Sequence, residues 1–72
     1  MMARPTASKA WIEHEAASIE RSAKESLPAW AFLGMTERYG EAMAKAAALR
    51  RVAGVEDLSF RRTLLRELGY AA

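Results

Sequence analysis

Apolar side chains recur every three or four residues along the chain, which is the period of an amphipathic helix. The first such segment is predicted to run from Thr6 to Ser26, with its apolar positions inside one arc of about 80°. These positions are Ile12, Ala16, Ile19, Ala23 and Leu27. Thr6 or Ser8 can cap the start, and Pro28 should end the helix because the residue before a proline is pushed out of α-helical geometry. The sequence therefore predicts a long helix with one narrow apolar face.

The most hydrophobic stretch of the chain comes next, from Pro28 to Met35. Proline favours the first position of a helix, so we predict a separate short helical turn in this stretch, ended by Gly34. Trp30, Phe32 and Leu33 cannot all share one face of such a turn. We expect at least one of them to fill the space between the long helices and another to stay accessible to a partner.

A second long helix is predicted from Thr36, which can cap it, to Ala53. Gly54 is expected just beyond its end in left-handed geometry. The apolar residues of this helix form a broad arc that should face the core. They are Tyr39, Ala42, Met43, Ala46, Ala47, Leu49 and Ala53.

A further ridge of small residues follows the second helix outside this arc, at Ala44, Ala48 and Val52. Small side chains at every fourth position let another helix approach closely. The ridge therefore offers a self-association surface for a homodimer. The alternative is that the alanines are exposed and are present because alanine is the best helix former.

The last helix is predicted to start between Glu56 and Ser59 and to end at Gly69. Its apolar residues point one way and are Leu58, Leu64, Leu65 and Leu68, with Phe60 beside them. Arg62 and Arg66 lie on the opposite side, four residues apart, and so form a concentrated positive patch.

These elements predict an all-α fold, a small bundle of three main helices with a short helical turn between the first and the second. Strands are not expected, because β-branched residues never cluster or alternate. A chain of 72 residues allows one domain, residues 1–72, in which 1–5 and 70–72 are predicted to be flexible tails. So small a domain buries only about 60% of the surface that its unfolded chain exposes. We therefore expect it to depend on self-association or on a partner.

Charge is unevenly spread over the chain. Residues 1–44 carry five basic and six acidic side chains, whereas residues 45–72 carry six basic and three acidic ones. A basic C-terminal part is compatible with nucleic acid or with an acidic protein surface and requires neither.

The sequence offers little for catalysis, so we predict that the protein is not an enzyme. His14 is the only histidine and cysteine is absent. At helical spacing, His14 shares its face with Ala10, Ala17 and Ser18, which supply no carboxylate to orient it. No pair of metal ligands falls on one helix face, and no glycine-rich loop is present to hold a phosphate. We therefore expect no catalytic, metal or cofactor site.

The function expected from these features is non-enzymatic regulation by binding a protein partner, in the manner of an inhibitor, antitoxin or adaptor. Small-residue stripes and the hydrophobic stretch imply more apolar surface than three short helices can hide. Aromatic residues and arginine dominate interface energetics, so the expected anchors are Trp30, Phe32, Met35, Arg62 and Arg66. No apolar stretch approaches the roughly 20 residues that span a bilayer. We expect a cytoplasmic protein without a membrane partner.

DNA binding is the alternative. Residues 42–68 are consistent with a helix, a short turn and a second helix, and the second helix would bring arginines to phosphates or guanine edges. Glu56 and Asp57 in the turn would face an anionic groove unless they cap the last helix. The pattern does not separate a helix-turn-helix motif from an ordinary helical hairpin.

Overall fold

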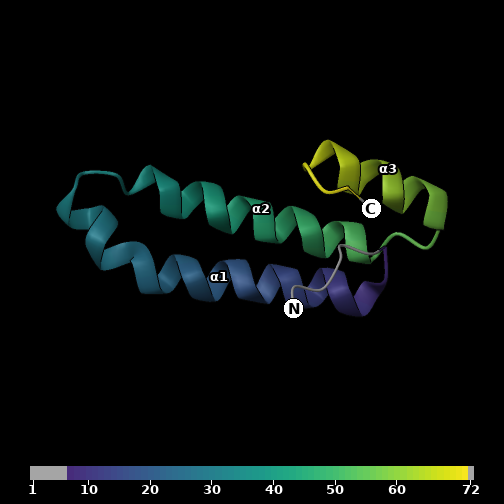
Figure 1. The fold of residues 1–72 in the computed structure, drawn as a ribbon, viewed down its shortest axis with the longest axis horizontal. Helices are drawn as coiled ribbons and strands as arrows, with labels where there is room; N and C mark the ends of the chain where they lie inside the picture. Colours follow the sequence, from purple (N-terminus) through teal and green to yellow (C-terminus); the bar gives the residue numbers. More distant parts are fainter. Residues whose placement is uncertain (1–6, 72) are drawn as a thin grey trace.

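The computed structural model describes residues 7–71, which form three helices and contain no strand. These are α1 (Lys9–Phe32), α2 (Glu37–Ala53) and α3 (Leu58–Glu67). The two long helices lie antiparallel, and α3 lies beside the C-terminal half of α2 (Figure 1). The molecule is elongated, with extents of 42 × 25 × 17 Å. The predicted all-α bundle of three helices is confirmed.

The first helix begins as predicted but ends later. Ser8 is its N-cap, and the Trp11 amide donates to the Ser8 hydroxyl at 3.2 Å. Pro28 lies inside α1, so the predicted break there is wrong and the expected short turn forms the last part of α1. Proline leaves the Lys24 carbonyl without its helical donor, but both residues are exposed, so water can serve that carbonyl. The cost of continuing the helix is therefore small.

Glycine ends both α1 and α3 in the same way. Gly34 has φ +70° and Gly69 has φ +95°, left-handed conformations that a side chain would strain. After α1, the Met35 amide donates to the Trp30 carbonyl at 2.7 Å. After α3, the Tyr70 amide donates to the Leu65 carbonyl at 3.0 Å. Both ends are Schellman motifs, and the predicted ends at Gly34 and Gly69 are confirmed.

The ends of α2 depart from the prediction in two respects. Thr36 occupies the N-cap position, but its side chain makes no capping hydrogen bond. Gly54 is right-handed, with φ −79°, so the predicted left-handed geometry is wrong. The last turn of α2 tightens instead, because the Gly54 amide donates to the Arg51 carbonyl at 3.2 Å. The chain can then continue to α3 without a left-handed residue.

The core is small and runs between the helices at the α3 end of the molecule. Its three largest fully buried side chains are Ile12, Leu49 and Leu65, one from each helix. Alanines fill much of the remainder and let α1 and α2 approach closely. The buried core residues are Ala7, Ile12, Ala16, Ala46, Leu49, Val52, Ala53 and Leu65. The predicted inner faces of α1 and α2 are thus confirmed, except that Ala47 is exposed.

Candidate interaction surfaces

Arg61 fixes the position of α3. Its Nε donates to the Val55 carbonyl at 2.9 Å, and its Nη1 donates to the Ala7 carbonyl at 2.8 Å. Its Nη2 also donates to the Val55 carbonyl. One guanidinium group therefore joins α3 to the link after α2 and to the start of α1. Sequence reasoning had counted Arg61 only as a basic residue, although it lies four residues before the buried Leu65, on the inner face of α3.

Tyr70 was predicted to belong to a flexible tail, but its side chain contacts residues of both long helices, so the prediction is wrong for this residue. Its ring meets Trp11 edge to face, with centroids 5.5 Å apart, and its hydroxyl donates to the Glu15 carboxylate at 2.8 Å. The Lys45 ammonium lies 4.9 Å from the Tyr70 ring centroid, which is a cation–π distance. Partial burial, followed by the Glu15 carboxylate, raises the pKa of Tyr70 above its ordinary range. The residue after α3 is thereby held on both long helices.

An ion pair ties α1 to α2 farther along the hairpin. Arg50 Nη1 lies 2.5 Å from the Glu20 carboxylate. The hydrogen bond from Arg50 lowers the pKa of the Glu20 carboxyl, and the same bond raises the pKa of Arg50. Glu20 is half-buried and Arg50 is exposed, so solvent screens the pair. Such a screened pair adds little to stability.

The end of the hairpin opposite α3 carries an exposed apolar surface, which we call the tip patch: Trp30, Phe32, Leu33 and Met35. The Phe32 residue is 90% exposed and Leu33 is 62% exposed, whereas Trp30 and Met35 are half-buried. The hydrogen bonds that close the Schellman motif after α1 hold this backbone in one conformation. The tip patch is therefore an apolar surface on a fixed frame.

The five predicted partner-binding residues divide into two separate sets. Trp30, Phe32 and Met35 lie where α1 ends, and Arg62 and Arg66 lie exposed on α3, at the other end of the hairpin (Figure 1). No single contact surface brings the two sets together. The aromatic residues and the arginines must therefore be assessed as independent candidate sites.

The ridge predicted for self-association is partly occupied within the chain. Val52 is only 6% exposed, because α3 packs over this part of α2, and Ala48 is half-buried. Ala44 is the one member of the ridge that is exposed. Val52 is thus covered within the chain, and self-association through Ala44 and Ala48 stays a prediction.

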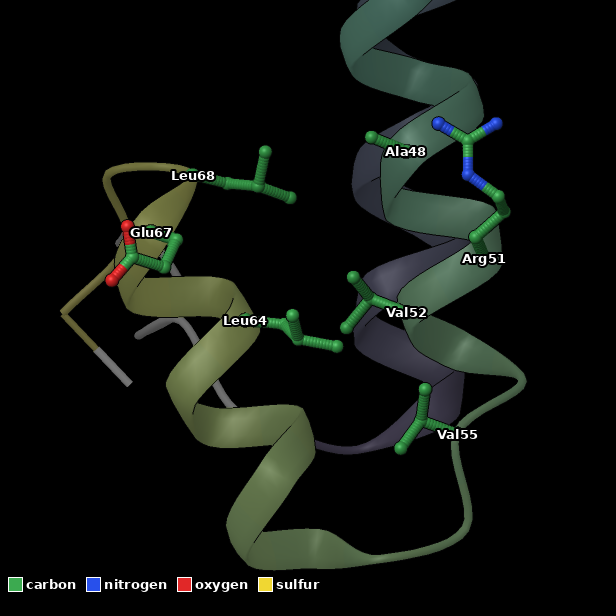
Figure 2. Close-up of a pocket in the computed structure, with 7 residues that line it drawn as sticks. All are labelled: Ala48, Arg51, Val52, Val55, Leu64, Glu67 and Leu68. Atoms are coloured by element: carbon green, nitrogen blue, oxygen red, sulfur yellow. The ribbon is translucent and has the colours of Figure 1, made fainter.

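A hollow of about 280 Å³ lies between α2 and α3. Its lining residues are Ala48, Arg51, Val52, Val55, Leu64, Glu67 and Leu68. Figure 2 shows Leu64 and Leu68 directed from α3 toward α2, with Ala48, Val52 and Val55 on the facing side. Arg51 lies on α2 and Glu67 on α3, and both side chains point away from the hollow. Sequence reasoning missed this hollow because it depends on how far α3 stands from α2.

The remaining chemistry of the described chain is sparse. His14 is exposed on α1, and no group of three His, Asp or Glu side chains within residues 7–71 is placed to hold a metal ion. None of the three helices has the length and apolar character needed to cross a bilayer. Comparison with protein-family models, with curated proteins and with solved structures found no match to the chain. Any functional proposal therefore rests on the surfaces described above.

Proposed function

We propose that the protein is a small non-enzymatic regulator that binds a partner protein through the tip patch. The observation that carries this proposal is the 90% exposure of Phe32 at the end of α1. Covering a phenylalanine side chain is worth roughly 1.5–3 kcal/mol. The chain does not obtain this energy by itself, whereas a partner with an apolar pocket would supply it.

The local geometry supports binding at this place. Phe32 and Leu33 are neighbours at the end of a helix, and Gly34 fixes the chain direction just beyond them. An anchor held by a helix loses little conformational freedom on binding, so more of the contact energy appears as affinity. Trp30 and Met35 extend the apolar surface on either side. Absence of cysteine suits a reducing compartment, so we place this activity in the cytoplasm.

The proposal is tested by affinity capture from the native host with the tagged full chain and with Phe32→Ala. We expect one protein to co-purify with the wild type, and the variant to bind it about 30-fold less tightly or not at all, as for an aromatic hot spot. Phe60→Ala is the matched control, because Phe60 is 53% exposed but lies on α3, away from the tip. Equal capture by wild type and Phe32→Ala, with unchanged circular dichroism, would overturn the proposal.

DNA binding through α3 is the second candidate, and the exposure of Arg62 and Arg66 one turn apart favours it. Asp57 caps α3, accepting from the Phe60 amide at 3.0 Å, so this acid is used within the protein. Arg61, in contrast, is committed to backbone carbonyls and is unavailable to phosphates. Two arginines on a helix of ten residues make a small basic surface.

Salt dependence distinguishes the two candidates. If Arg62 and Arg66 contact phosphates, the affinity for duplex DNA falls steeply with salt. Replacing either arginine by alanine then reduces the slope of log K against log salt by about one unit. Binding to the captured protein through the tip patch responds to neither replacement. Affinity for DNA that ignores salt would exclude α3 as a phosphate-binding helix.

A further inference from the structure

The tip patch belongs to a longer segment of the chain that carries no charge. Residues 26–36 contain no acidic or basic side chain, although charged residues make up 28% of the chain. Charges return directly on each side, with Lys24 and Glu25 before the segment and Glu37 and Arg38 after it. These four side chains are exposed, and two of them are basic and two acidic. The tip of the hairpin is therefore uncharged and has balanced charges at its borders.

Apolar positions surround the end of α1 and do not form a single face. Trp30 and Phe32 are two residues apart in the helix, so they point to nearly opposite sides of it. Ala29 and Ala31 lie on the two flanks between these sides, and both are exposed. Leu33, the C-cap residue, is 62% exposed. A flat surface could cover only one of these sides at a time.

We propose that the partner protein encloses the tip patch in a concave, uncharged apolar pocket, into which the hairpin inserts end first. This inference rests on the proposed function, because it concerns the same surface and names the chemistry of the partner's site. A pocket covers Phe32 and Leu33 together with both flanks of α1, whereas a flat face leaves one side in water. The pocket walls are uncharged, because a charged group buried against residues 26–36 would find no countercharge there.

Two other occupants fit the tip patch less well. A second copy would meet it end to end, and the shorter extents of the molecule are only 25 × 17 Å. Such a contact is small beside the roughly 800 Å² that each partner buries in a standard interface. A bilayer surface attracts proteins through clustered basic residues, but Lys24 and Arg38 are matched by Glu25 and Glu37. An uncharged protein pocket requires neither a large end face nor a basic border.

A charge scan of the two flanks tests the enclosure. Ala29 and Ala31 are each replaced by Asp and by Lys, and the immobilised full chain is exposed to a lysate of the native host. All four variants should bind the captured protein at least about tenfold less tightly, because each buries a charge without a countercharge. Ala47→Asp and Ala47→Lys are the matched controls, since Ala47 is exposed on α2 outside the uncharged segment. Both should bind as the wild type does.

The outcomes separate this inference from the proposed function. Unchanged capture by Phe32→Ala overturns the proposed function itself. Loss of capture by Phe32→Ala, with normal capture when Ala29 or Ala31 carries either charge, overturns only the enclosing pocket and leaves a one-sided contact. Tighter binding with one sign of charge would reveal a charged partner site and overturn it too.

The other occupants are tested with the wild type alone. Binding to vesicles of phosphatidylcholine would identify a bilayer as the occupant, and a dimer that Phe32→Ala abolishes would identify a second copy. Either result would overturn the enclosing pocket. Circular dichroism of every variant checks that α-helix content is preserved, which we expect because Ala29, Ala31 and Phe32 are all exposed.

Discussion

The hydroxyl of Tyr70 donates a hydrogen bond to the Glu15 carboxylate at 2.8 Å, joining positions 55 residues apart in the chain. Tyr70 follows α3, and Glu15 lies in α1. This contact, together with the edge-to-face packing of Tyr70 on Trp11, holds the end of α3 against the first helix. The bundle is therefore closed at the α3 end by a side chain outside the helices.

Tyr70→Phe should lower the free energy of unfolding by about 1 kcal/mol at neutral pH. The ring and its contact with Trp11 remain, so the loss is that of one partly exposed hydrogen bond to a carboxylate. Urea denaturation followed by circular dichroism measures the change. Tyr39→Phe is the matched control and should change stability by less, and an equal loss in both variants would contradict the role given to Tyr70.

Alkaline pH should destabilise the wild type more steeply than Tyr70→Phe. Partial burial raises the pKa of Tyr70 above its ordinary value of 10.0. Above about pH 10 the unfolded chain releases this proton while the folded chain keeps it, so the free energy of unfolding falls as pH rises. Below that pH the contribution is fully present. The free energies of unfolding of the wild type and Tyr70→Phe should differ at about pH 8 and lie closer together at about pH 10.5. A difference that is the same at both pH values would contradict the prediction.

Arg61→Ala should loosen α3 while leaving the α1–α2 hairpin folded. The change removes the hydrogen bonds to the carbonyls of Val55 and Ala7, each worth about 1–3 kcal/mol for a charged donor in a partly buried place. Amide hydrogen exchange should then speed up by tenfold or more across α3 and much less in α2. Arg62→Ala is the control, since Arg62 is exposed and should leave exchange unchanged.

Acid should weaken the link between Glu20 and Arg50. Arg50 lowers the pKa of the Glu20 carboxyl below its ordinary value of 4.5, so the contribution of this carboxylate to stability is present above that pH and lost as pH falls through the lowered pKa. Glu20→Gln should therefore lose less stability than the wild type below about pH 4.5. Glu25→Gln, on the same helix, is the matched control for the loss of a carboxylate charge. Added salt should reduce the difference.

Leu49→Ala and Phe32→Ala should differ sharply in their effect on folding. Leu49 is fully buried, so its truncation leaves a cavity and costs about 2–5 kcal/mol, which is a large part of the stability of so small a domain. Phe32 is 90% exposed, and its replacement should change the free energy of unfolding by no more than about 0.5 kcal/mol. Thermal denaturation of the two variants provides the comparison.

Periodicity alone predicted the inner faces of the long helices, because burial of Ile12, Ala16 and Leu49 follows directly from a 3.6-residue repeat. Glycine, rather than periodicity, predicted the ends at Gly34 and Gly69, since few other residues adopt a left-handed conformation, although the same expectation was wrong at Gly54. Local rules were less successful at Pro28, where solvent access lets a helix continue despite a missing donor.

Long-range contacts were the part that the sequence could not supply. The roles of Arg61 and Tyr70 arise from carbonyl and carboxylate groups more than 50 positions away, which no local pattern indicates. The candidate sites also divide into one that the local sequence predicted and one that depends on long-range packing. The exposure of Phe32 agrees with the expectation that one aromatic residue of its segment stays accessible. The hollow beside Leu64 depends on how α3 packs against α2, so the sequence could not predict it.

The elongated hairpin has a mechanical consequence for binding. At about 1.5 Å per residue, the 17 residues of α2 hold the tip patch roughly 26 Å from the start of α3. A partner bound at the tip patch would therefore leave α3 uncovered at the far end of the molecule (Figure 1). The hairpin would then act as a spacer that keeps whatever binds the tip patch clear of α3.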